Sequence, residues 1–144
     1  ELFYEEGKWY FSRGAFTTLA ELDDGTYPSA MAVMINVLLS LGALVDQKYR
    51  RFAFKSLEYV SLKLMKTPIY YPALTAQAIR WLHEERIVKA KSKNLLRLPK
   101  GYAYPFVLLR NDETLELFLI CGTQSCFATT ADPDTVDRLI RSTL

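Results

Sequence analysis

Cysteine and histidine are scarce in this chain, and both scarcities limit its chemistry. It contains two cysteines and one histidine among 144 residues. A structural zinc site needs about four such ligands, so Cys121, Cys126 and His83 are too few, and we expect no metal and no cofactor. Two cysteines are also too few for a secreted disulfide scaffold, which favours a reducing cytoplasm as the compartment.

Excess charge and long apolar runs are missing as well. The 18 basic residues nearly balance the 16 acidic ones, so no strong field would attract nucleic acid. The longest apolar run, residues 30–45, is interrupted by Asn36, Ser40 and Gly42. It is shorter than the roughly 18–20 apolar residues that span a bilayer. We therefore expect neither nucleic acid nor a membrane as a partner.

The chain is rich in the residues that build a core. Half of it is hydrophobic and 13% is aromatic, which predicts a folded protein rather than a disordered one. The first residues, Glu1-Leu2-Phe3-Tyr4, contain no initiator methionine and no signal-peptide pattern. We interpret the sequence as a fragment of a longer protein.

Helical spacing of apolar residues predicts three successive helices in the first part of the chain. They cover residues 28–44, residues 47–66 and a segment from Pro72 onward, and short links favour antiparallel neighbours. Thr26 and Asp46 are candidate caps of the first two. Apolar side chains cover nearly every direction of the first helix, which predicts burial all round. In the third, Arg80 and Glu84 have the spacing of an ion pair.

Strand-like patterns dominate elsewhere. Near the start, a turn at Glu6-Gly7 is typical of a short hairpin. From about residue 85, strands are predicted over residues 87–90, 104–110 and 115–121. A helical turn lies within residues 93–98, and residues 111–114 would form a hairpin-like turn. The last helix begins at Asp132-Pro133, which supplies a cap and a first-turn proline.

These elements predict an α+β fold. Residues 1–85 would form an antiparallel helical part, and residues 86–144 a small C-terminal α/β lobe with about three strands. No flexible linker separates the two parts, so we expect them to share a core.

Cys121 and Cys126 are candidates for redox chemistry. Five extended steps would hold their Cα atoms roughly 16 Å apart, beyond disulfide range, so bonding requires a bend between them. On one strand, this odd spacing would also place the side chains on opposite faces. No charged neighbour in sequence activates a thiolate. The pair could be inert structural thiols or a reversible disulfide.

Asp23 and Asp24 precede the first helix as a pair of carboxylates. Such a pair could provide the general acid and base of a glycosidase-like catalytic site. The alternative is that Asp-Asp-Gly forms a turn and a cap.

Ser29, Asn36 and Ser40 are candidate cavity-facing residues, because their spacing places three polar groups on one stripe of an apolar helix. Buried polar groups need partners. The stripe either bonds nearby backbone or faces a water-filled cavity.

Two further features, a histidine and a basic segment, indicate surface or capping roles rather than catalysis or ligand binding. His83 near a helix end is typical of a surface or capping histidine. The segment 86–100 contains six basic residues and no acidic one, which favours a solvated face over phosphate contact.

Two stretches resemble the YyaL-like family, the thioredoxin-domain-containing relatives of spermatogenesis-associated protein 20. Asp24-Gly-Thr-Tyr-Pro-Ser29 before a long apolar helix is similar to its D-G-x-x-P-S-G-N-S element. Ile120-Cys-Gly-Thr-Gln-Ser-Cys126 followed by Asp132-Pro133 is similar to its C-x-x-x-x-C and D-P helix start. The chain has Ala30-Met31-Ala32 where the family has Gly-Asn-Ser, which removes polar groups expected to face a cavity.

The resemblance implies the C-terminal part of a longer protein. A thioredoxin-like domain would come first, followed by an (α/α) six-hairpin barrel similar to sugar epimerases and glycosidases, and the helices here would close that barrel. The expected partner is the rest of the same chain, and an isolated fragment could self-associate. The expected role is structural or binding; the alternatives are part of a carbohydrate-processing enzyme and a redox partner acting through Cys121 and Cys126.

Overall fold

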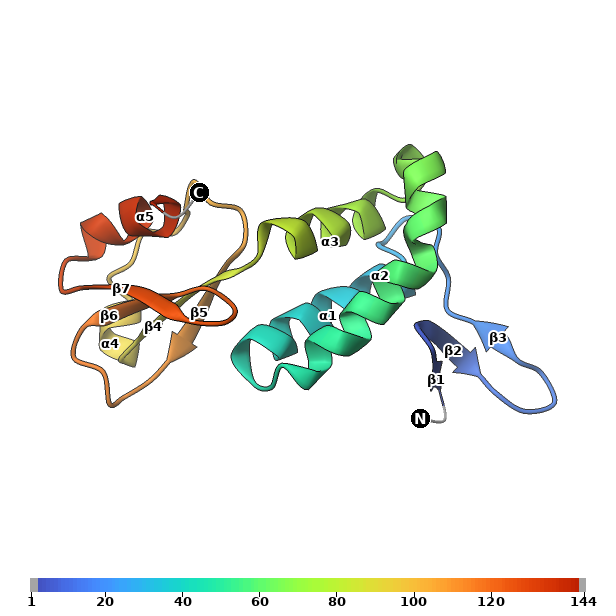
Figure 1. Ribbon diagram of the computed structural model, residues 1–144, viewed down its shortest axis with the longest axis horizontal. Helices are drawn as coiled ribbons and strands as arrows, with labels where there is room; N and C mark the ends of the chain where they lie inside the picture. Colours follow the sequence, from blue (N-terminus) through green and yellow to red (C-terminus); the bar gives the residue numbers. More distant parts are fainter. Residues whose placement is uncertain (1–2, 143–144) are drawn as a thin grey trace. The chain divides into compact units, whose positions relative to one another are not determined.

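The computed structural model describes residues 3–142, which divide into two compact units between Leu82 and His83 (Figure 1). Within residues 3–142 there are five α-helices, one short 3-10 helix, a three-stranded antiparallel sheet and a four-stranded mixed sheet. The predicted α+β class is confirmed. None of the helices in this range is long and apolar enough to cross a bilayer.

The first unit opens with a small sheet of β1 (Tyr4–Glu5), β2 (Lys8–Ser12) and β3 (Thr18–Leu19). The predicted turn joins β1 to β2, with positive φ at Glu6 (44°) and Gly7 (91°).

Three helices follow. They are α1 (Ala30–Leu44), α2 (Lys48–Lys66) and α3 (Pro72–His83), and the 3-10 helix η1 (Pro68–Tyr70) precedes α3. The cap of α1 is Ser29, whose Oγ accepts a hydrogen bond from the Ala32 N–H at 3.4 Å. The predicted cap Thr26 is wrong, because the helix begins only at residue 30. At α2, Asp46 Oδ1 accepts from the Lys48 N–H at 2.8 Å.

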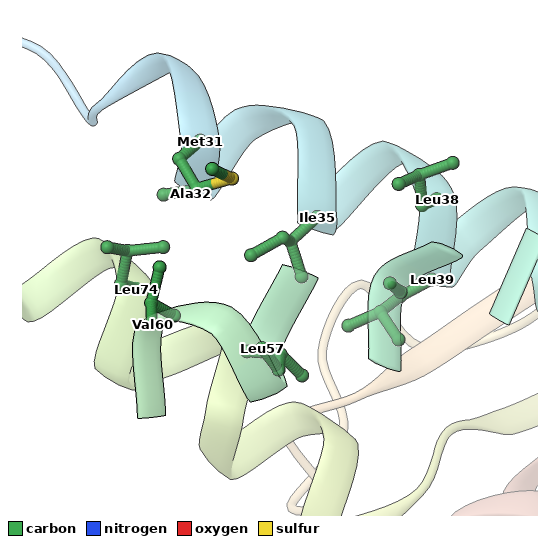
Figure 2. Close-up of a cluster of buried hydrophobic side chains, with 9 residues drawn as sticks. Met31, Ala32, Ile35, Leu38, Leu39, Leu57, Val60 and Leu74 are labelled. Atoms are coloured by element: carbon green, nitrogen blue, oxygen red, sulfur yellow. The ribbon is translucent and has the colours of Figure 1, made fainter. Parts of the chain in front are cut away.

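The core of this unit lies where the three helices meet. Figure 2 shows Met31, Ile35 and Leu39 of α1 directed toward Leu57 of α2 and Leu74 of α3. Ile35 and Leu39 are fully buried. Removing these apolar surfaces from water is the main term that stabilises the unit.

The prediction that α1 is buried all round is wrong for the described chain. Val33, Met34 and Val37 are 49%, 36% and 45% exposed. Within the helical unit, α2 and α3 cover the side of α1 that carries Ile35 and Leu39. A 3.6-residue period places residues 33 and 37 away from that side.

The second unit is built on a four-stranded sheet with the order β5-β4-β6-β7. The strands are β4 (Arg86–Ala90), β5 (Val107–Asn111), β6 (Phe118–Cys121) and β7 (Cys126–Thr130). β4 runs parallel to β5 and antiparallel to β6, and β6 is antiparallel to β7.

Two strand predictions fail. Residues 111–114 do not form a hairpin, because β4 lies between β5 and β6. Val88 and Ile87 of β4 are buried, and a strand buried on both faces belongs inside a sheet. The lobe also has a fourth strand, β7, that the predicted set of three omits.

Two helices complete the second unit. The short α4 (Ser92–Leu95) follows β4, and α5 (Pro133–Arg141) ends the described chain. The predicted start of α5 is confirmed, since Asp132 Oδ1 accepts from the Asp134 N–H at 3.0 Å. Each unit thus has its own cluster of buried side chains. That of the second unit contains Val88, Ala90, Leu98, Tyr104, Phe118, Ile120, Val136 and Ile140. A core shared between the units stays a prediction.

Candidate functional site

Asp24 is held by the backbone at the starts of two helices. Its Oδ1 accepts a hydrogen bond from the Ser29 N–H, and its Oδ2 accepts from the Ala73 N–H, both at 2.7 Å. Ser29 caps α1, and Ala73 is the second residue of α3. Helix N-termini present unsatisfied N–H groups and a partial positive charge, so a carboxylate there is stabilising. This is the geometry of a shared cap.

Asp23 lies beside Asp24 in sequence but differs from it in environment. Its side chain is in an exposed position, whereas Asp24 is half-buried. If one of the two carboxylates acts on a substrate, the accessible Asp23 is the better candidate.

The polar stripe of α1 forms most of its hydrogen bonds with an arginine side chain. Arg80 of α3, 7% exposed, donates from Nη1 to the Asn36 backbone oxygen at 3.2 Å and also to Asn36 Oδ1. Its Nη2 donates to Ser40 Oγ at 2.9 Å. Ser29 lies apart from this cluster and serves as the cap of α1. Ser40 Oγ also donates to the Asn36 backbone oxygen at 3.0 Å, so this part of the stripe bonds nearby backbone, as in the first alternative, with Arg80 as a further donor.

Arg80 was missed because its spacing to Glu84 suggested an ion pair. The helix ends at His83, and Glu84 has a left-handed φ of 60°, so the helical spacing does not reach Glu84. The sequence offered only a weak signal, two polar residues four apart on an apolar helix, because Asn36 is exposed and Ser40 is half-buried, so neither requires a buried partner.

Cys121 and Cys126 form a disulfide across the β6–β7 hairpin. The chain reverses at residues 122–125, where the Gly122 N–H donates to the Ser125 oxygen at 2.8 Å. The two cysteines are register partners on adjacent strands. The expectation of opposite faces is therefore wrong, because it applied to residues on one strand. Of the two alternatives, the structure contains the disulfide.

The two cysteines of this disulfide differ in their exposure and in their charged neighbours. Cys121 is 2% exposed, whereas Cys126 is in an exposed position. Lys89 of β4 directs its Nζ to 4.0 Å from Cys126 Sγ. The sequence suggested no activating charge, and Lys89 was missed because it is 37 residues from Cys126. Only the order of the strands brings the two together.

The basic segment 86–100 does not form one uniform surface. Arg86 is 6% exposed, and its guanidinium lies over the ring of Tyr104 at 5.2 Å and that of Phe127 at 5.7 Å. Lys91 forms an ion pair with Glu116. Lys93, Arg97 and Lys100 are exposed. Part of the segment is solvated, as predicted, and part stabilises the second unit.

His83 is exposed at the end of α3. Its backbone oxygen accepts a hydrogen bond from the Tyr104 hydroxyl, which also donates to the Glu84 oxygen at 2.8 Å. Burial raises the pKa of Tyr104, which favours the protonated donor. Within residues 3–142, no group of three or more His, Cys, Asp or Glu side chains is placed to hold a metal ion.

The fold and these sites define a mixed α+β protein of two compact units, with a capped helical unit and a disulfide-bonded lobe. Comparison with known proteins gives no relative, since no family model, curated protein or solved structure matches the chain.

Proposed function

We propose that the chain is a structural part of a larger protein, in which its helices contribute to the wall of an (α/α) six-hairpin barrel of the YyaL-like kind. The remainder of the same protein, including a thioredoxin-like domain, would be its partner. The two motif resemblances support this proposal. So does the succession of helices joined by short links in the first unit.

The observation that carries the proposal is the composition of α1. Its 15 residues include no charged side chain. One side packs against α2 and α3, and the other exposes Val33, Met34 and Val37 together with one polar residue, Asn36. A helix on the surface of a globular protein normally has a charged or polar outer face. An apolar outer face is instead typical of a helix that packs between two layers.

A pair of lysine substitutions tests this surface. In dilute solution the 144-residue chain should self-associate and bind an apolar dye. The double variant Val33→Lys with Val37→Lys should reduce both self-association and dye binding. It should not lower the melting temperature, because the two side chains contribute little to the buried core. The control is Leu62→Lys on α2, an exposed position whose neighbours on the same helix face, Glu58 and Lys66, are already charged and exposed. A monomeric wild-type chain that binds no dye would contradict the proposal.

The alternative is that the chain is part of a carbohydrate-processing enzyme. The exposed Asp23, just before α1, favours it. In the complete gene product, Asp23→Asn would then abolish turnover of a sugar substrate with no change in melting temperature. Unchanged turnover would rule Asp23 out, and because Asp24 caps two helices, Glu21 would be the remaining exposed carboxylate of the loop between β3 and α1.

A further inference from the structure

The β6–β7 disulfide has one sulfur that solvent can reach and one that it cannot. Cys126 begins β7, which is an edge strand of the sheet, and is exposed. Cys121 ends β6, pairs with Ile87 of the other inner strand, β4, and is 2% exposed. A thiolate breaks a disulfide by attacking one of its sulfurs, and access decides which sulfur is attacked. Because Cys126 is the exposed cysteine, an external thiolate attacks its sulfur rather than that of Cys121.

Charge favours the same cysteine as the nucleophile of the reverse direction, in which the reduced pair attacks an external disulfide. Lys89 Nζ lies 4.0 Å from Cys126 Sγ, and a nearby ammonium stabilises a thiolate. The other charged groups near the turn are Arg86 and Glu84, whose Nη1 and Oε2 atoms lie 3.8 Å from each other. A Cβ added at Gly122 would be 3.8 Å from Arg86 Nη1 and 3.9 Å from Glu84 Oε2. Arg86 and Glu84 thus pair with each other, and Lys89 is the cation placed against Cys126 Sγ.

We propose that this hairpin is a thiol–disulfide exchange site whose co-substrate is a thiol. An external thiolate attacks Cys126 Sγ and forms a mixed disulfide with it. The Cys121–Cys126 bond breaks, and its electron pair goes to Cys121 Sγ, which then takes up a proton. A second external thiolate attacks the external sulfur of the mixed disulfide. This step releases the Cys126 thiolate beside Lys89 and forms one external disulfide.

The complete exchange transfers two electrons. The protein disulfide is reduced to two thiols, and two external thiols are oxidised to one disulfide. In the reverse direction, the Cys126 thiolate attacks an external disulfide, and Cys121 then displaces the external thiol. Cys126 is thus the attacking cysteine and Cys121 the resolving one, while Lys89 is a positioning residue. The chemistry depends only on the second unit and stands apart from the barrel proposal.

Single-cysteine variants test the roles of the two sulfurs. With oxidised glutathione as the probe, Cys121→Ser should form one mixed disulfide, read by mass spectrometry. Cys126→Ser should react slower by roughly tenfold or more, because its remaining thiol is buried. Equal rates in the two variants would overturn the proposal.

The wild-type chain provides a measurement that does not depend on a variant folding. After reduction with dithiothreitol, a short pulse of iodoacetamide should label Cys126 before Cys121, as read by peptide mapping. In urea both should be labelled at the same rate. Labelling of Cys121 first in the native chain would overturn the assignment.

Lys89 is tested by a pH profile, which a purely structural residue would not move. In the Cys121→Ser background, the rate of alkylation of Cys126 rises with pH as its thiolate forms. Lys89→Gln should shift the midpoint of that rise to higher pH, because the thiolate loses its cation. Lys93→Gln, which removes an exposed cation on α4, is the matched control. An unmoved midpoint in Lys89→Gln would remove Lys89 from the site.

Discussion

At the scale of one residue, Asp24 shows that the same sequence pattern can indicate either a catalytic carboxylate or a helix cap. An Asp-Asp-Gly segment before a helix suits an acid–base pair as well as a cap. The structure engages both oxygens of Asp24 with backbone N–H groups, one at the start of α1 and one in the first turn of α3. The second contact is to a residue 49 positions away, so no local pattern could predict it.

This geometry makes Asp24 a stability residue. Asp24→Asn keeps one acceptor oxygen and turns an amide N–H₂ toward the other backbone donor. It should lower the free energy of unfolding by about 1–2 kcal/mol, measured by urea denaturation. Asp23→Asn is the control and should change stability by less than about 0.5 kcal/mol. Equal losses in the two variants would contradict the shared cap.

The cysteine site was only half predictable from the sequence. The spacing correctly required a bend between Cys121 and Cys126, and the structure has it at residues 122–125. The position of Lys89 depends on a strand order in which β4 and β7 both flank β6. That order is set by burial of β4 on both faces, which is a property of the whole sheet.

At the scale of elements, the N-terminal hairpin packs closely against α2 because its turn contains a glycine. A Cβ at Gly7 would lie 2.2 Å from the Lys55 backbone oxygen, and the residue has a φ of 91°. Trp9 of the same hairpin donates from Nε1 to Ser56 Oγ of α2 at 2.8 Å. The turn was predicted from Gly7 alone, whereas its packing on α2 was not, because that contact joins segments almost 50 residues apart.

Substitution of Gly7 should therefore disturb both the turn and the packing. Gly7→Ala should lower the free energy of unfolding by about 1–3 kcal/mol, from the strained φ and the clash with backbone. Gly25→Ala is the control, since a Cβ there meets nothing within 4 Å and its φ is not positive. The comparison is made by thermal and urea unfolding. A neutral Gly7→Ala would contradict the close approach.

The link between α1 and α2 should respond to acid. Hydrogen bonds from Lys48 to Asp46 lower the pKa of this carboxyl from its ordinary value. A lowered folded-state pKa contributes stability that is present above the unfolded-state value and is lost as the pH falls through the folded-state value. Asp46→Asn should remove that part of the acid sensitivity, seen in urea midpoints recorded from neutral pH downward. Parallel curves for the variant and the wild type would contradict this role.

At the scale of the whole molecule, helical segments were predicted better than strands. The three long helices and the last helix were found because their apolar period extends over many residues and their caps are local. Strands of four or five residues leave little periodicity, so β7 was missed and the link between β5 and β6 was misread as a hairpin. Pairing between distant strands is a non-local property that short patterns do not encode.

The whole-molecule claim is that a partner layer covers the uncharged outer face of α1. The most direct measurement is the labelling rate of a single thiol at Val37→Cys, without reductant, in the 144-residue chain and in the complete gene product. The account predicts fast labelling in the chain, at a concentration low enough to keep it monomeric, and slow labelling in the complete product, whereas Leu96→Cys, at a position 87% exposed, reacts equally fast in both. Equally fast labelling at position 37 in both proteins would contradict it.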